Sequence, residues 1–125
     1  MANTGPEHKV QVQIIKWLRD TMPKCIIQHC RNEHGKAGVA GMRAAQRQKA
    51  AGVMSGFPDL ICLPDASVGP FFLEVKAPRG SATSVQKQVH KMLRDQGYPV
   101  AVVKSIEDVR DFLTTEGIKF NEVQL

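Results

Sequence analysis

Apolar residues recur along the chain at the two spacings that distinguish helices from strands. A segment near the start has apolar residues three or four positions apart, the periodicity of a helix with one buried face, and Pro23 ends it. Two later segments share this periodicity and follow serine or threonine caps, while a segment rich in alanine, arginine and glutamine ends at Gly52. The predicted helices cover about residues 7–22, 42–51, 84–96 and 105–113.

Four shorter segments are apolar and rich in β-branched or aromatic residues, which indicates strands. The second and third flank the turn-rich sequence PDASVG, so they predict an antiparallel β-hairpin. A predicted helix separates the third from the fourth, and such a crossover places two strands parallel. The predicted strands cover residues 24–30, 58–63, 70–77 and 99–103, and the tail 117–125 is expected to form a short extra strand or an arm.

The order of these elements predicts an α/β fold, in which helices cover the faces of a mixed β-sheet. The chain has 125 residues, the size of one domain, so we treat residues 1–125 as a single unit. No apolar stretch could cross a bilayer and no signal peptide is evident, which favours a cytoplasmic protein with no membrane partner. Cys25, Cys30 and Cys62 are odd in number and lack paired spacing, so we expect reduced thiols.

Basic residues outnumber acidic ones by 17 to 12, and the resulting net charge of +5 favours a polyanionic partner. The excess is concentrated between residues 31 and 49, where five basic residues accompany one acid. A basic surface there would attract nucleic-acid phosphates, although an ordinary solvated face would carry the same charges. The candidate DNA-binding residues in this region are Arg31, Asn32, Lys36, Arg43 and Arg47.

Three charged residues in the predicted hairpin are the strongest chemical signal. Side chains alternate faces along a strand, so Glu74 and Lys76 share one face of the strand over 70–77. Asp59 begins the partner strand and supplies a second carboxylate at cross-strand distance. Charges in a mostly apolar strand are costly unless they are paired or bind a metal, so their presence requires a reason.

Two carboxylates at one place suit a hard cation such as Mg²⁺ or Mn²⁺. A metal held by Asp59 and Glu74 would polarise a scissile phosphate and acidify a bound water, while Lys76 orients the water or neutralises developing charge. The carbonyl of Val75 is a further candidate oxygen ligand. Glu7 lies at the end of the apolar face of the first helix, so we expect it to point inward, towards the metal.

The sequence Gly56-Phe57-Pro58-Asp59-Leu60, followed after a gap by Glu74-Val75-Lys76, resembles the motif of the PD-(D/E)XK nuclease superfamily. The surrounding sequence is similar to the VRR-NUC family, the virus-type replication-repair nuclease domain found as a stand-alone chain in phage and bacteria. The similarity extends over nearly the whole chain. It is carried further by Glu7 with Gln11, by Arg31-Asn32-Glu33, and by Ser84-Val85-Gln86 with Leu93 and Gly97-Tyr98.

This resemblance implies a Mg²⁺- or Mn²⁺-dependent endonuclease with a nuclease-like α/β core. It implies metal ligands at Glu7, Asp59, Glu74 and the Val75 carbonyl, and catalytic roles for Asp59, Glu74, Lys76 and Gln86. It also implies a homodimer that cuts branched DNA, in particular four-way junctions, like a Holliday-junction resolvase in DNA repair. Two active sites related by a two-fold axis would match the two symmetric strands of a junction.

Three other interpretations remain open at this point. Asp59 and Lys76 could form a structural ion pair, in which case the chain would be a DNA-binding or recruitment module without catalysis. A sequence-specific restriction-type nuclease is disfavoured because so short a chain has no room for a recognition domain. Zinc binding by Cys25, His29, Cys30 and His34 is disfavoured by their spacing, and His8 and His90 are expected at the surface.

Overall fold

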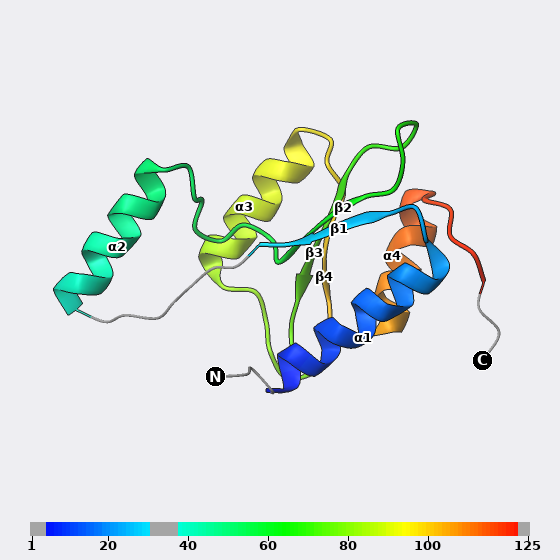
Figure 1. The fold of residues 1–125 in the computed structure, drawn as a ribbon, viewed down its shortest axis with the longest axis horizontal. Coiled ribbons are helices and arrows are strands. Elements are labelled where there is room, and N and C mark those ends of the chain that lie inside the picture. Colours follow the sequence, from blue (N-terminus) through cyan, green and yellow to red (C-terminus); the bar gives the residue numbers. More distant parts are fainter. Residues whose placement is uncertain (1–4, 31–37, 123–125) are drawn as a thin grey trace.

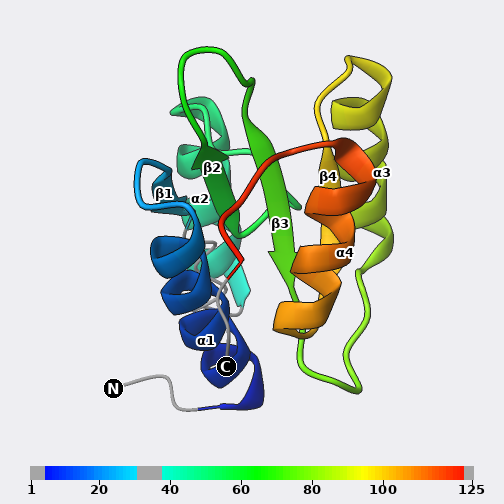
Figure 2. The same ribbon diagram turned by 90° about the vertical axis from the view of Figure 1, so that its right-hand side faces the viewer.

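The protein forms a four-stranded mixed β-sheet with helices on both faces. A computed structural model describes residues 5–30 and 38–122. Figure 2 shows α1 and α4 side by side on one face of the sheet, with α3 against the other, and Figure 1 shows α2 standing apart from the sheet. The elements are α1 (Pro6–Thr21), β1 (Ile26–His29), α2 (Gly38–Ala50), β2 (Leu60–Leu63), β3 (Phe71–Val75), α3 (Ser84–Asp95), β4 (Val100–Val103) and α4 (Ile106–Glu116).

The strands follow one another across the sheet in chain order, β1-β2-β3-β4. β1, β2 and β3 are antiparallel neighbours, and β4 is parallel to β3, because α3 carries the chain back before β4 begins. The predicted hairpin, the parallel last strand and the α/β class are therefore confirmed. Asp65 stabilises the hairpin turn, since its Oδ1 accepts hydrogen bonds from both the backbone N–H and the hydroxyl of Ser67.

The hydrophobic core lies between the sheet and the α1–α4 layer. Alternate residues of β3 enter this core, namely Phe71, Leu73 and Val75, and pack with apolar residues of α1 and α4. The intervening residues Phe72 and Glu74 face the α3 side, as strand alternation predicts. Two different environments therefore meet at β3, one wholly apolar and one that contains a carboxylate.

Helix α2 differs most from its prediction. It begins at Gly38, four residues before the predicted start at Met42, and ends at Ala50. Gly38 and Gly41 have low helix propensity, so the sequence did not predict that the helix includes this first turn. No side chain of α2 is buried, so Arg43 and Arg47 are both solvent-exposed on a helix that makes little contact with the rest of the protein.

The described part of the tail forms an arm rather than a strand. Gly117 ends α4 with a φ of 70°, the left-handed conformation that glycine adopts readily. The chain then returns to α1, where the ring of Phe120 lies 5.4 Å from that of Trp17 and the Asn121 N–H donates to the Thr21 carbonyl. Within the described residues, no helix is both apolar enough and long enough to cross a membrane.

Candidate functional site

Asp59 and Glu74 face each other at one end of the β2–β3 hairpin. Leu60 pairs with Leu73 in the antiparallel register, so the residue before β2 lies opposite Glu74. The N–H of Val75 donates to Oδ2 of Asp59 over 2.7 Å, while the Cys30 N–H donates to the Asp59 carbonyl. Backbone groups of two neighbouring segments therefore fix both the main chain and the side chain of Asp59.

The Val75 carbonyl points towards the same side as its N–H. In an extended strand the N–H and C=O of one residue lie on the same edge, and the Val75 N–H is bonded to Asp59. The next residue, Lys76, donates its N–H in the opposite direction, to Val103 in the line of β4. The Val75 carbonyl is therefore on the Asp59 side of β3, which is where the sequence predicted an oxygen ligand.

Glu74 is a buried carboxylate with an unusual electrostatic environment. Its side chain is 1% exposed and is hydrogen-bonded to that of Asp59. Burial raises the pKa of Glu74 to about 9, and the Asp59 and Glu7 carboxylates act in the same direction, whereas Lys76 opposes them. Two carboxylates in contact cannot both ionise at low cost, so Glu74 holds a proton at neutral pH unless a metal cation binds.

Glu7 and Lys76 border this pair of carboxylates. Glu7 lies in the first turn of α1 and is solvent-exposed, so it is not buried with the apolar face of the helix, and its role as a metal ligand stays a prediction. Pro6 begins the helix, so Glu7 stands in its first turn. An acid at this exposed end stays hydrated and is stabilised by the helix dipole. Its negative charge still acts on Glu74, and among the described residues the half-buried Lys76 supplies the positive charge that lowers the pKa of Glu74.

His90 is a site neighbour that the sequence placed wrongly at the surface. It lies in α3 with 2% exposure, and its Nε2 is 3.3 Å from Oε1 of Glu74. Burial lowers the pKa of His90, and the positive charge of Arg94 lowers it further. Because the pKa of Glu74 moves up while that of His90 moves down, the contact is a hydrogen bond between neutral groups and not an ion pair.

The periodicity of α3 contained the signal for His90. The inward arc of this helix is made of residues at positions i, i+3, i+4 and i+7, whereas the apolar residues Val85 and Met92 lie outside it and are 47% and 50% exposed. The four residues of the inward arc are Gln86, Val89, His90 and Leu93.

Gln86 has a structural role at the start of α3. Its Oε1 accepts the N–H of Thr83, and the Thr83 hydroxyl accepts the N–H of Gln86, which together form a capping box. The side chain is half-buried on the arc that also carries His90. These contacts fix the first turn of the helix, and the catalytic role of Gln86 stays a prediction.

The donor set fits a hard divalent cation. In the described part of the chain, no three histidine, cysteine or acidic side chains converge on one point. Mg²⁺ commonly takes only one or two carboxylates from a protein and completes its shell with water and substrate phosphate. Asp59 and Glu74, already in contact and short of positive charge, meet that requirement, with the Val75 carbonyl beside them.

The basic candidates are divided between described and undescribed parts of the chain. Arg43 and Arg47 lie on α2, one helical turn apart and both exposed. Arg31, Asn32 and Lys36 lie outside the described residues, as does His34 of the disfavoured zinc set. The cysteines Cys25, Cys30 and Cys62 are free thiols, as predicted.

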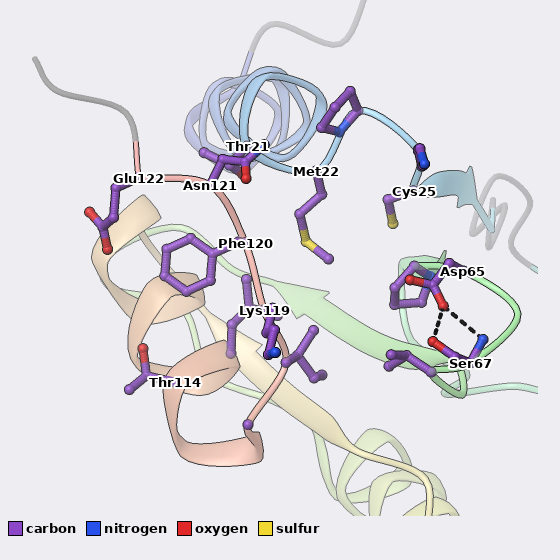
Figure 3. Close-up of a pocket in the computed structure, with 17 residues that line it drawn as sticks. Thr21, Met22, Cys25, Asp65, Ser67, Thr114, Lys119, Phe120, Asn121 and Glu122 are labelled. Carbon is purple, nitrogen blue, oxygen red and sulfur yellow. Dashed lines mark hydrogen bonds between the residues drawn. The ribbon is translucent and has the colours of Figure 1, made fainter.

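A pocket of about 970 Å³ lies at the opposite end of the sheet from the two carboxylates. Figure 3 shows its walls, which come from the end of α1, the hairpin turn, the end of α4 and the tail. Neither Asp59 nor Glu74 lines this pocket, so the chemistry of the site does not depend on it.

Comparison with known proteins agrees with the motif and the fold. The family model described as the VRR-NUC domain matches residues 1–107. A solved structure named "VRR_NUC domain protein" is similar with a TM-score of 0.66 and 24% identity, covering 91% of this chain and 89% of that one. A comparison with curated proteins gives no match. Because the family match spans most of the chain, this protein belongs to the VRR-NUC family of nuclease domains.

Proposed function

We propose that this protein is a Mg²⁺- or Mn²⁺-dependent DNA endonuclease that prefers branched substrates, in particular four-way junctions. One observation carries the proposal: a buried carboxylate, Glu74, meets a second carboxylate, Asp59, beside Lys76 at the end of a hairpin. Family membership supports a nuclease acting on DNA. The choice of metal and the preference for junctions extend that conclusion.

Each residue of the site has a defined task in this proposal. Asp59, Glu74 and the Val75 carbonyl hold the cation, and the exposed Glu7 contributes negative charge at the entrance. The bound cation supplies Lewis acidity towards the scissile phosphate and acidifies water. Lys76 orients the attacking water or neutralises charge that develops on the phosphate, and Gln86 assists from the first turn of α3.

The exposed helix α2 is the proposed contact for the DNA backbone. Arg43 and Arg47 point to solvent from a helix without acidic residues, as phosphate-binding side chains must. Arg31, Asn32 and Lys36, which lie outside the described residues, are further proposed contacts to DNA. The protein acts in the cytoplasm, in agreement with its free thiols, and as a homodimer whose two sites cut the two symmetric strands of a junction.

The test is a cleavage assay on end-labelled four-way junction and on linear duplex of matching sequence, in Mg²⁺, Mn²⁺ or EDTA. Asp59→Asn is the comparison variant, since an amide oxygen can still accept the Val75 N–H while the negative charge is lost. We expect metal-dependent cuts at the junction that are absent in EDTA and in the variant. Equal cutting of linear duplex would contradict the junction preference, and no cutting in any metal would favour a DNA-binding module instead.

The dimer is tested separately by measuring the molar mass in solution. Light scattering after size-exclusion chromatography should give twice the 13.8 kDa of one chain. The mass of one chain, with junction cleavage intact, would contradict the two-site arrangement while leaving the chemistry unaffected.

A further inference from the structure

Buried polar side chains are few in the described part of the chain. They are Thr21, Glu74 and His90. The Thr21 hydroxyl donates to the Trp17 carbonyl of its own helix, which satisfies it locally. The other two come from different elements, β3 and α3, and contact each other. This contact is a long-range polar contact in an interior that is otherwise apolar.

The direction of this hydrogen bond depends on the state of Glu74. An ionised carboxylate can only accept hydrogen bonds, so whenever Glu74 is ionised at a cation the hydrogen must be on Nε2 of His90. Placing that hydrogen on Nε2 fixes the tautomer of the ring. Nε2 of His90 lies 3.3 Å from Oε1 of Glu74, so in this tautomer it can donate to Oε1 and limit the rotation of the carboxylate beside Asp59.

The position of His90 is itself well determined. The capping box of Thr83 and Gln86 fixes the start of α3, and Val89 beside His90 is 5% exposed. Leucine has a similar volume and would bury at this place without the desolvation cost of an imidazole. A histidine that served packing alone would therefore gain nothing from its polar ring, whereas one that orients a carboxylate requires it.

We infer that His90 is a positioning residue for Glu74, and that its ring N–H sets the orientation of this carboxylate at the divalent-cation site. The inference rests on the proposed function, because it assigns Glu74 to the metal. Groups that hydrogen-bond to metal ligands typically change metal affinity by about 10- to 100-fold when they are removed. Removing the donor at position 90 should therefore weaken metal binding while the fold is retained.

The test compares His90→Leu, which removes the donor, with His90→Gln, whose amide nitrogen can occupy the place of Nε2. Mn²⁺ affinity is measured by titration calorimetry, and thermal unfolding in EDTA reports on the fold. We expect His90→Leu to bind Mn²⁺ about 10- to 100-fold more weakly than wild type, and His90→Gln to stay within about threefold. A His90→Leu variant that binds as wild type does, or a His90→Gln variant that is equally weak, would overturn the inference.

Two further results separate this inference from the proposed function. If wild type binds Mn²⁺ but cuts no DNA, the nuclease proposal fails, and the Mn²⁺ affinities of the variants still decide the role of His90. If wild type binds no Mn²⁺, both fail. Should His90→Leu not fold, His90→Asn replaces it, because its shorter amide does not reach the Nε2 position, and weak Mn²⁺ binding is again expected.

Discussion

At the scale of single residues, the main feature of the site is the electrostatic repulsion between two carboxylates that lie in contact. Asp59 is anchored by the Val75 N–H, and Glu74 is forced against it inside the protein. Without a cation, the lowest-energy solution is a proton on Glu74. A metal ion bound by both carboxylates would remove this repulsion, because it would favour the ionised form of each.

The raised pKa of Glu74 predicts a pH-dependent stability of the metal-free protein. The pKa of Glu74 is about 9 when folded and near 4.5 when unfolded, so between these values the folded state holds a proton that the unfolded state has lost. The free energy of unfolding should therefore fall as pH rises, by about 1.4 kcal/mol per pH unit. Urea unfolding in EDTA between pH 7 and 8.5 should show a loss of about 2 kcal/mol in wild type.

Glu74→Gln is the matched control for this measurement, since an amide keeps the shape but cannot ionise. Its loss of stability over the same pH range should be smaller by the full Glu74 contribution. The range begins at pH 7 because the lowered pKa of His90 gives the opposite trend only below about pH 6.5. A wild-type stability that stays flat or rises would refute the raised pKa.

Some residues of the candidate site could be predicted from the sequence and others could not. Asp59, Glu74 and Lys76 were predictable because strand alternation and hairpin register determine which side chains meet. His90 was missed because the buried face of α3 was predicted from its apolar residues alone, whereas His90 and Gln86 share the inward arc with Val89 and Leu93. Glu7 was placed inward by periodicity, which cannot distinguish the end of an apolar face from its interior.

At the scale of elements, the site depends on how the segment before β2 meets α3. Gly56 has a φ of 83°, and a Cβ at this position would lie 2.8 Å from Cγ1 of Val85 and 2.9 Å from its carbonyl oxygen. Only glycine lets the two backbones approach so closely. This approach brings Asp59, three residues later, to its place opposite Glu74.

Gly56→Ala should therefore destabilise the protein more than a glycine substitution in open space. Gly52→Ala is the matched control, because Gly52 also has a positive φ, of 99°, but a Cβ there meets nothing within 4 Å. We expect about 1 kcal/mol from the backbone strain in both and at least another 1 kcal/mol from the clash in Gly56→Ala. Equal losses in urea unfolding would show that the contact with Val85 is readily relieved.

The capping box gives a second prediction at this scale. Thr83→Ala removes the acceptor of the Gln86 N–H, so the first turn of α3 should loosen at a cost of about 1 kcal/mol in unfolding free energy. Ser81→Ala, at an exposed position before the cap, should change the stability by less than about 0.5 kcal/mol. Identical urea midpoints for the two variants would contradict the assigned N-cap.

Element boundaries illustrate what propensity can and cannot predict. The hairpin, the crossover and α4 follow from apolar periodicity, because each buries one face. Helix α2 buries no side chain, so its sequence has no apolar periodicity that would predict its bounds. Its glycines have low helix propensity, so the first turn was not predicted. The tail became an arm on α1 through the Phe120–Trp17 contact, which no local pattern specifies.

At the scale of the whole molecule, the fold separates stability from chemistry. The α1–α4 side of the sheet contains the apolar core, whereas the α3 side contains the buried carboxylate and its histidine. Variants on the α3 side can therefore lose activity while the core keeps the protein folded. Because of this separation, variants of the candidate site can be tested without loss of the fold.

The most direct test of that site is single-turnover cleavage of labelled four-way junction in Mg²⁺ by Lys76→Ala, with Lys16→Ala as control. Lys16 is an exposed lysine on α1. We expect Lys76→Ala to fold as wild type does and to cleave at least about 100-fold more slowly, because Lys76 is the positive charge beside Asp59 and Glu74. Lys16→Ala should cleave at the wild-type rate. Wild-type cleavage by a folded Lys76→Ala variant would contradict the assignment of this site as the catalytic centre.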